Sequence, residues 1–302
     1  MQSPDGTQAA GTDHAGWRMT VAGQAARVYG ENRDLAAMAV AGSVGAGLAD
    51  QFSDLELDCY WLRPPSDEER LAPVRALGGE LTALWDYDPG DAEWSEDYLV
   101  GELGVTVSNF LVSTVGQFLD NVLLRSSTDP VQHMRLAALQ RSRPLLGAET
   151  MAAWRKRAET FPRPLVSALV EQALAPEVLT GWPAREAFLD RGDRLALRDL
   201  MVRTGHAAVR AVLALNHVYL PHRQLKWQHQ LTTGLRLTPS RFAERLKVMS
   251  DGPPGDALPA AETLLAETVT LAGSHCDADL TEFREMLIER RRAIGPPPPR
   301  VP

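Results

Sequence analysis

Two carboxylates, Asp54 and Glu56, stand two residues apart in the amino-terminal third of the chain. They flank Leu55 in a run that alternates apolar and polar residues, which is typical of a β-strand. Successive side chains of a strand point to opposite faces, so both carboxylates project from the same face. Mg²⁺ is commonly bound by one or two carboxylates together with substrate phosphates. The spacing therefore predicts a site for a divalent cation and a polyphosphate.

A Gly-Ser turn precedes these acids. Gly42-Ser43 follows an apolar strand predicted over residues 35–41, and ten residues separate Ser43 from Asp54. Backbone N–H groups and a hydroxyl at a helix start suit an anion. Taken alone, the turn is better explained as a tight turn with Ser43 as an ordinary N-cap. The sequence has no Gly-Lys-Ser/Thr, which excludes a P-loop, and its glycines do not follow the dinucleotide-binding pattern.

The elements that must position these residues follow from hydrophobic periodicity and from Pro and Gly breaks. The region from Val131 to Arg292 shows helical periods and no convincing strand. The predicted elements are a helix over 17–32, strands over 35–41 and 55–62, a helix from Ser66 to about Leu77, a strand with an acidic loop over 78–97, a strand region over 98–112 with a kink at 101–104, a helix from Ser113, and a long helix over 191–219.

This pattern predicts the α+β class, with a small mixed-sheet domain followed by an all-helical domain. The predicted organisation is a disordered leader over residues 1–16, the sheet domain over 17–128, the helical domain over 129–292 and a Pro-rich tail over 293–302.

Composition narrows the class of protein. The chain has 302 residues, 44% of them hydrophobic, and a net charge of −8. The negative charge argues against a general nucleic-acid binder, which would carry a basic face. No apolar run is long enough to span a membrane, and the polar start has no hydrophobic signal core, so we expect a cytoplasmic protein. The two cysteines and the histidines have no metal-binding spacing.

The run from Gly42 to Leu57 resembles the signature of the nucleotidyltransferase superfamily that includes the kanamycin, streptomycin and lincosamide adenylyltransferases. That signature is a hydrophobic residue, Gly-Gly or Gly-Ser, a gap of about nine to thirteen residues, and two acids flanking a hydrophobic residue. Residues 215–219 and 225–227 are similar to the helical domain of a bacterial subgroup of this superfamily. The resemblance covers most of residues 35–250.

The resemblance implies a Mg²⁺-dependent transfer of a nucleoside monophosphate, usually AMP from ATP, to a hydroxyl of a small, antibiotic-like acceptor. By this correspondence Gly42 and Ser43 bind the β- and γ-phosphates, while Asp54 and Glu56 hold the metal. Lys226 lies in the helical part that resembles the subgroup, and we expect it to contact the nucleotide phosphates.

A third acid is usual in this superfamily, on a later strand. The predicted strand over 105–112 places Asn109 at that position. An amide can coordinate through its oxygen but cannot accept a proton at neutral pH. Glu102 would reach the site if the strand register were shifted, and Asp86 and Asp88 are further candidates. Because Asn109 stands at this position, two alternative functions stay open: a catalytically impaired nucleotide-binding protein, or an antitoxin-like interaction protein on the same fold.

Overall fold

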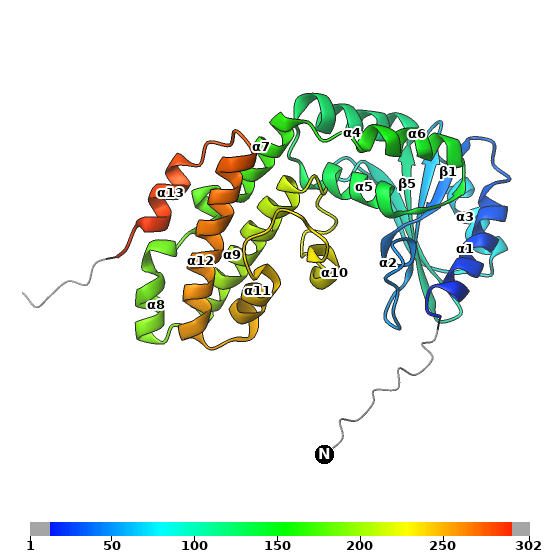
Figure 1. Ribbon diagram of the computed structural model, residues 1–302. Helices are drawn as coiled ribbons and strands as arrows, with labels where there is room; N and C mark the ends of the chain where they lie inside the picture. Colours follow the sequence, from blue (N-terminus) through cyan, green and yellow to red (C-terminus); the bar gives the residue numbers. More distant parts are fainter. Residues whose placement is uncertain (1–12, 292–302) are drawn as a thin grey trace, which may run out of the picture. The chain divides into compact units, whose positions relative to one another are not determined.

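The structure is a computed structural model that describes residues 13–291 (Figure 1). These residues form a mixed α/β protein with one six-stranded mixed sheet and many helices. The predicted disordered leader, apart from residues 13–16, and the predicted Pro-rich tail lie outside the described residues. None of the helices within 13–291 is long and apolar enough to cross a membrane.

The sheet has the strand order β3-β4-β5-β2-β1-β6. Only β2 and β5 pair in parallel among these strands, and the other neighbours are antiparallel. The strands are β1 (Leu35–Val40), β2 (Leu55–Trp61), β3 (Glu80–Asp88), β4 (Glu93–Val100), β5 (Leu103–Leu111) and β6 (Arg143–Leu146).

The segment predicted as a strand with an acidic loop is a hairpin of β3 and β4. Its acids lie on the strands as well as in the turn, and the Glu96 side chain is fully buried. The rings of Tyr87 and Trp94 pack 4.6 Å apart between the two strands. Cross-strand aromatic pairs stabilise antiparallel strands, so this pair favours the hairpin although many acidic residues surround it.

Helices cover both faces of the sheet (Figure 1). On one face, α1 packs against β1 and β2 and α3 against β3; on the other, α4 packs against β5 and α6 against β1. The predicted start of α3 at Ser66 is confirmed, because Ser66 and Glu69 form a reciprocal capping box. The helices are α1 (Gly16–Tyr29), α2 (Gly42–Gly45), α3 (Asp67–Ala76), α4 (Val112–Arg125), α5 (Pro130–Arg141) and α6 (Ala148–Ala158).

Strand β6 corrects the expectation that no strand follows residue 131. It pairs with β1, where Met38 lies opposite Leu146 and Val40 opposite Arg143. The strand has only four residues and contains Pro144, so its alternation is too short to read from the sequence. β6 pairs with β1, and α6 packs against β1. The first compact unit therefore consists of the described residues up to Arg125 together with Val131–Thr160, and it extends past the expected boundary near 128.

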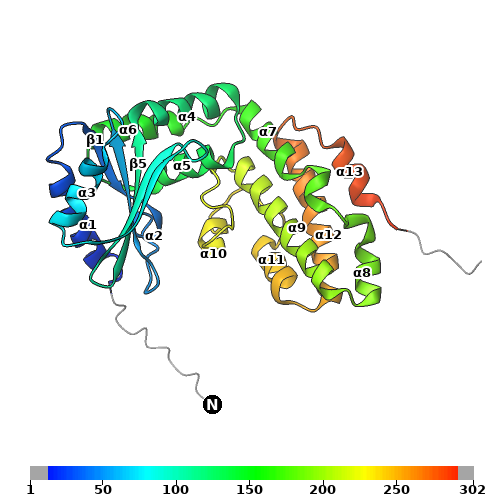
Figure 2. The ribbon, with the colours of Figure 1, turned by 180° about the vertical axis from the view of Figure 1, so that it is seen from behind.

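The second compact unit contains Ser126–Pro130 and the described residues from Phe161 onward, and every regular element of that part is helical (Figure 2). Its core surrounds α9, whose 22 residues lie within the predicted 191–219. The helices are α7 (Arg163–Ala173), α8 (Arg185–Arg191), α9 (Arg194–Leu215), α10 (Gln228–Thr232), α11 (Phe242–Asp251), α12 (Pro254–His275) and α13 (Thr281–Ile288), with 3-10 turns at Pro176–Leu179 and Trp182–Ala184.

Candidate functional site

The two acids of the predicted metal site lie where the alternation of β2 places them. Leu55 and Leu57 are 0% and 1% exposed and belong to the core beneath the sheet. Asp54, just before the strand, and Glu56 are exposed and project from the opposite face. This face is open at the start of β2, so two carboxylates are accessible to a ligand there.

The Gly42 turn lies directly against one of these acids. The backbone N–H of Ala41 donates to the carbonyl oxygen of Glu56 at 2.9 Å, which holds the end of β1 beside β2. Gly42 has φ +56°, and a Cβ added there would lie 2.4 Å from the Glu56 Oε1 atom. A side chain at residue 42 would therefore displace the Glu56 carboxylate. Ser43 follows, half-buried, in the single turn of α2.

The prediction that Asn109 lies beside the two acids is wrong. In the parallel register of β2 and β5, Asn109 is opposite Cys59, on the face that points into the core. Its Oδ1 accepts from Trp61 Nε1 at 2.8 Å, and its Nδ2 donates to Glu96 Oε2 at 2.9 Å. Asn109 is thus a buried structural residue on the far side of the sheet from Glu56.

The residues of β5 that lie opposite Glu56 and Asp58 have hydroxyl side chains. Thr106 is opposite Glu56, and Ser108 is opposite Asp58. Thr106 Oγ1 donates to Asp97 Oδ1 at 2.7 Å, so Glu56, Thr106 and Asp97 form one row across three strands. Neighbouring strands lie about 4.8 Å apart, which separates the backbones of Glu56 and Asp97 by about 10 Å.

The other predicted candidates for the third acid are not part of this row. Glu102 is exposed in the turn between β4 and β5. Asp86 and Asp88 lie on β3, the edge strand, and two strands separate β3 from β2. The separation of about 14 Å that this implies is beyond the reach of an Asp side chain to the metal ligands on β2.

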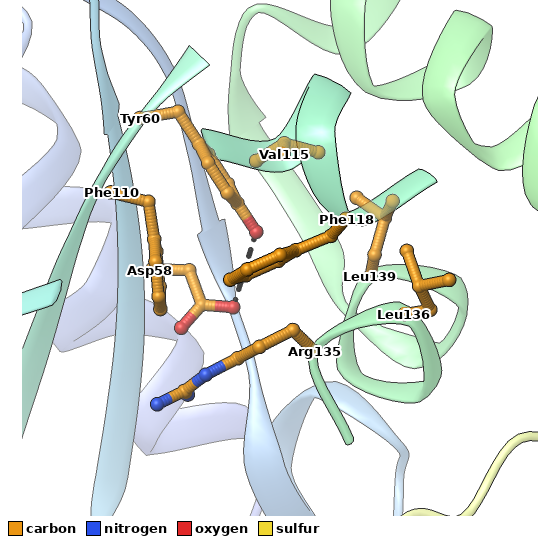
Figure 3. Close-up of a pocket in the computed structure, with 8 residues that line it drawn as sticks. All are labelled: Asp58, Tyr60, Phe110, Val115, Phe118, Arg135, Leu136 and Leu139. Atoms are coloured by element: carbon orange, nitrogen blue, oxygen red, sulfur yellow. Dashed lines mark hydrogen bonds between the residues drawn. The ribbon is translucent and has the colours of Figure 1, made fainter. Parts of the chain in front are cut away.

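Asp58 is the acid that the sequence analysis missed. It continues the spacing of Asp54 and Glu56 on the same face, but it is only 5% exposed. Tyr60 Oη donates to its Oδ2 at 3.2 Å, and the Arg135 side chain extends toward it from α5 (Figure 3). Burial raises the pKa of Asp58, opposed by the Arg135 charge and by the hydrogen bond from Tyr60.

Arg135 pairs with Glu93 and brings its positive charge near Asp58 at this end of the face. Its Nη2 donates to Glu93 Oε2 at 2.7 Å, and its guanidinium lies 4.8 Å from the centre of the Phe110 ring. Burial also raises the pKa of Glu93. The cavity beside Asp58 and Arg135 measures about 10 Å³, room for about one water molecule. A ligand on this face would therefore sit at the exposed end, beside Asp54 and Glu56.

The donor set at the exposed end fits a cation bound together with its substrate. No three Asp, Glu, His or Cys side chains converge as a metal site within residues 13–291. Asp54 and Glu56 supply two carboxylates, and Mg²⁺ usually completes its coordination with water and substrate phosphates. Lys226 is exposed in the second unit, between Leu225 and Trp227, which both have left-handed backbone conformations. Its contact with a nucleotide stays a prediction.

No family model matches the chain, and a search of the curated proteins finds no match. The interpretation of the site therefore depends on its residues and their geometry.

Proposed function

We propose that the chain binds a nucleoside triphosphate with Mg²⁺ beside Asp54 and Glu56 and transfers a nucleoside monophosphate, AMP from ATP, to a hydroxyl of a small acceptor. On this proposal the sheet unit is a nucleotidyltransferase domain and the helical unit its partner domain. The observation that supports it most is the contact of the Gly42 turn with the Glu56 carboxylate, beside a second acid on the same face.

The roles of the chain's own residues follow from this arrangement. The α2 turn offers backbone N–H groups and the Ser43 hydroxyl to the β- and γ-phosphates. Asp54 and Glu56 hold the cation, which neutralises phosphate charge and aligns the reacting groups. The acceptor oxygen forms a bond to the α-phosphorus, the bond to pyrophosphate breaks, and the acceptor proton passes to a base. Transfer consists largely of such positioning, so the chain needs few other groups.

A second candidate function is nucleotide binding without transfer. Thr106, opposite Glu56 on β5, is the observation that favours it, because a threonine hydroxyl cannot take up the acceptor proton at neutral pH. In this case the unit keeps the Mg²⁺–nucleotide site as a sensor or as part of a larger assembly.

Calorimetric titration of the full chain with ATP, with and without Mg²⁺, tests the shared site. We expect Mg²⁺-dependent binding that weakens at least tenfold in Glu56→Gln and in Asp54→Asn. Glu102→Gln is the matched control, since Glu102 is an exposed acid at the end of the sheet where β2 begins, and it should bind like the wild type. Absence of ATP binding, or equal binding by all four proteins, would overturn both candidate functions.

Transfer is then measured separately, with ATP labelled in the α-phosphate and a panel of aminoglycosides and lincosamides. A labelled acceptor that forms with the wild type and not with Glu56→Gln supports the transferase. Tight, Mg²⁺-dependent binding with no labelled product across the panel favours the second candidate.

A further inference from the structure

A cavity of about 110 Å³ lies in the second unit, lined by α9, α10, α11 and the segment before α10. Met201, Gly205 and Val209 recur every four residues along α9 and therefore share one face. Leu246 and Met249 of α11 also line the cavity. Met201, Val209, Leu246 and Met249 belong to the buried core, so the inner wall is apolar.

Gly205 keeps this space open. It lies in the middle of α9, where glycine is less favourable than alanine. Its backbone does not have a positive φ, so its conformation suits any residue. A Cβ built on it would lie 3.6 Å from Leu246 Cδ2 and 4.0 Å from Met249 Cε, which are ordinary contacts. Neither the backbone nor crowding requires a glycine, and what its missing side chain provides is room.

Polar groups line the cavity where it meets solvent. His206 is half-buried, Gln228 and Ser250 are exposed, and Val202 is 54% exposed. Burial lowers the pKa of His206, and the nearby Arg210 charge adds to this effect. The imidazole is therefore neutral at pH 7 and offers one hydrogen-bond donor and one acceptor.

The geometry points to a binding site for a small, uncharged compound built on one ring and carrying one hydrogen-bonding group. An apolar protein cavity of about 150 Å³ accepts benzene, so a single ring would fill these 110 Å³ and extend into the open mouth. The ring would lie among Met201, Leu246 and Met249, whose methionine side chains adapt readily to a ligand. Its polar group would meet His206. All the lining residues belong to the second unit, whereas Asp54 and Glu56 belong to the first, so this site does not depend on the proposed metal ligands.

Phenol is the probe, titrated into the full chain labelled with ¹³C at the methionine methyl groups. We expect saturable shifts of the Met201 and Met249 methyl signals, each assigned with a Met→Leu variant. Toluene, which lacks the hydroxyl, should bind more weakly, and 1-naphthol should be excluded by its size. No saturable shift with phenol overturns the proposal, and equal binding of toluene overturns the assigned role of His206.

Gly205→Leu should fill the cavity and weaken phenol binding at least tenfold. Gly255→Leu is the matched control, because Gly255 is also in a helix, α12, and a Cβ there has open space around it. If circular dichroism shows Gly205→Leu to be unfolded, Val202→Trp replaces it, since Val202 is exposed at the mouth of the cavity. Binding unchanged in the folded variant would place phenol elsewhere and overturn the proposal.

Discussion

At the scale of single residues, Asn109 shows how closely a buried polar side chain is tied to its neighbours. Its side chain accepts a hydrogen bond from Trp61 and donates one to Glu96. Glu96 also accepts from Arg70, whose Nε lies 2.8 Å from Glu96 Oε2. Burial raises the pKa of Glu96 to about 7, although Arg70, Asn109 and Tyr29 all act to lower it. Every member of such a network must keep its partner, because an unsatisfied buried group is costly.

Asn109→Asp therefore should not create a more active site but should destabilise the fold. It removes the donor to Glu96 and places a second carboxyl against it, which we expect to cost about 2–3 kcal/mol. Two adjacent acids bind a proton more tightly in the native state than in the unfolded state. Their folded pKa values are raised, so stability falls as pH rises, and the loss should be larger at pH 8 than at pH 5.

Urea unfolding of wild type and variant at the two pH values measures this effect. Thr106→Val serves as the control on the other face of the same strand and should show little change in the pH dependence. An Asn109→Asp protein as stable as the wild type at pH 8 would contradict the assignment of Asn109 to the core network.

The same period of two explains which site residues could be predicted from the sequence. Leu55 and Leu57 fix the phase of β2, so Asp54 and Glu56 were placed correctly on the open face. On β5 the buried Val105 and Val107 put Asn109 on the core face. Phe110, on the other face, is buried as well, so alternation near the end of this strand does not show from the sequence which face Asn109 takes. Asp58 shares the face of Glu56, but its burial depends on α5, far along the chain.

At the scale of elements, the turn after β1 depends on glycine for two separate reasons. Gly42 has a positive φ, and a Cβ added there would lie 2.4 Å from Glu56 Oε1. Gly78, after α3, also has a positive φ, +66°, but a Cβ there would meet nothing within 4 Å. The two positions share the backbone strain of a substitution. They differ in the contact with an acid, and Gly42 is half-buried whereas Gly78 is exposed.

Gly42→Ala and Gly78→Ala thus form a matched pair. Both should lose about 1–2 kcal/mol of stability, because alanine is strained in the left-handed region. Only Gly42→Ala should also displace Glu56 and weaken Mg²⁺-dependent ATP binding, by about tenfold or more. Denaturation and calorimetric titration measure the two effects. Equal ATP binding by both variants would contradict the role of the turn in positioning Glu56.

Element prediction failed where local signals conflict with distant packing. The hairpin of β3 and β4 carries many acidic residues, which indicate a loop. Tyr87 and Trp94 favour strands, and their contact across the hairpin is not visible in the sequence. Glu96 becomes acceptable inside β4 only because Arg70 reaches it from α3. The α3 start, by contrast, was predicted well, since its capping residues lie within one turn of each other.

At the scale of the whole molecule, the first unit is completed by segments that follow α4. β6 forms the outer strand beside β1, and the Trp154 ring of α6 packs 5.1 Å from that of Tyr60 on β2. Arg155 Nε donates to the carbonyl oxygen of Leu139, which joins α6 to α5. The sheet is therefore incomplete at residue 128, where the change from strand to helical periodicity predicted a boundary.

A fragment of residues 13–160 should fold, and a fragment of residues 13–128 should not. The shorter one exposes the β1 edge and the apolar surface around Met38 and Tyr60, a loss that exceeds the small net stability of a domain. Circular dichroism and cooperative urea unfolding distinguish the two. Cooperative unfolding of 13–128 would show that β6 and α6 are accessory to the sheet.

The late position of β6 also matters while the protein is being made. β1 leaves the ribosome long before residues 143–146, and until they emerge its outer edge has no strand to pair with. Open strand edges pair readily with other chains, and partly made domains are prone to aggregate. A pause in translation just after residue 128 would prolong that exposure, whereas a pause after residue 160 would leave the edge already covered.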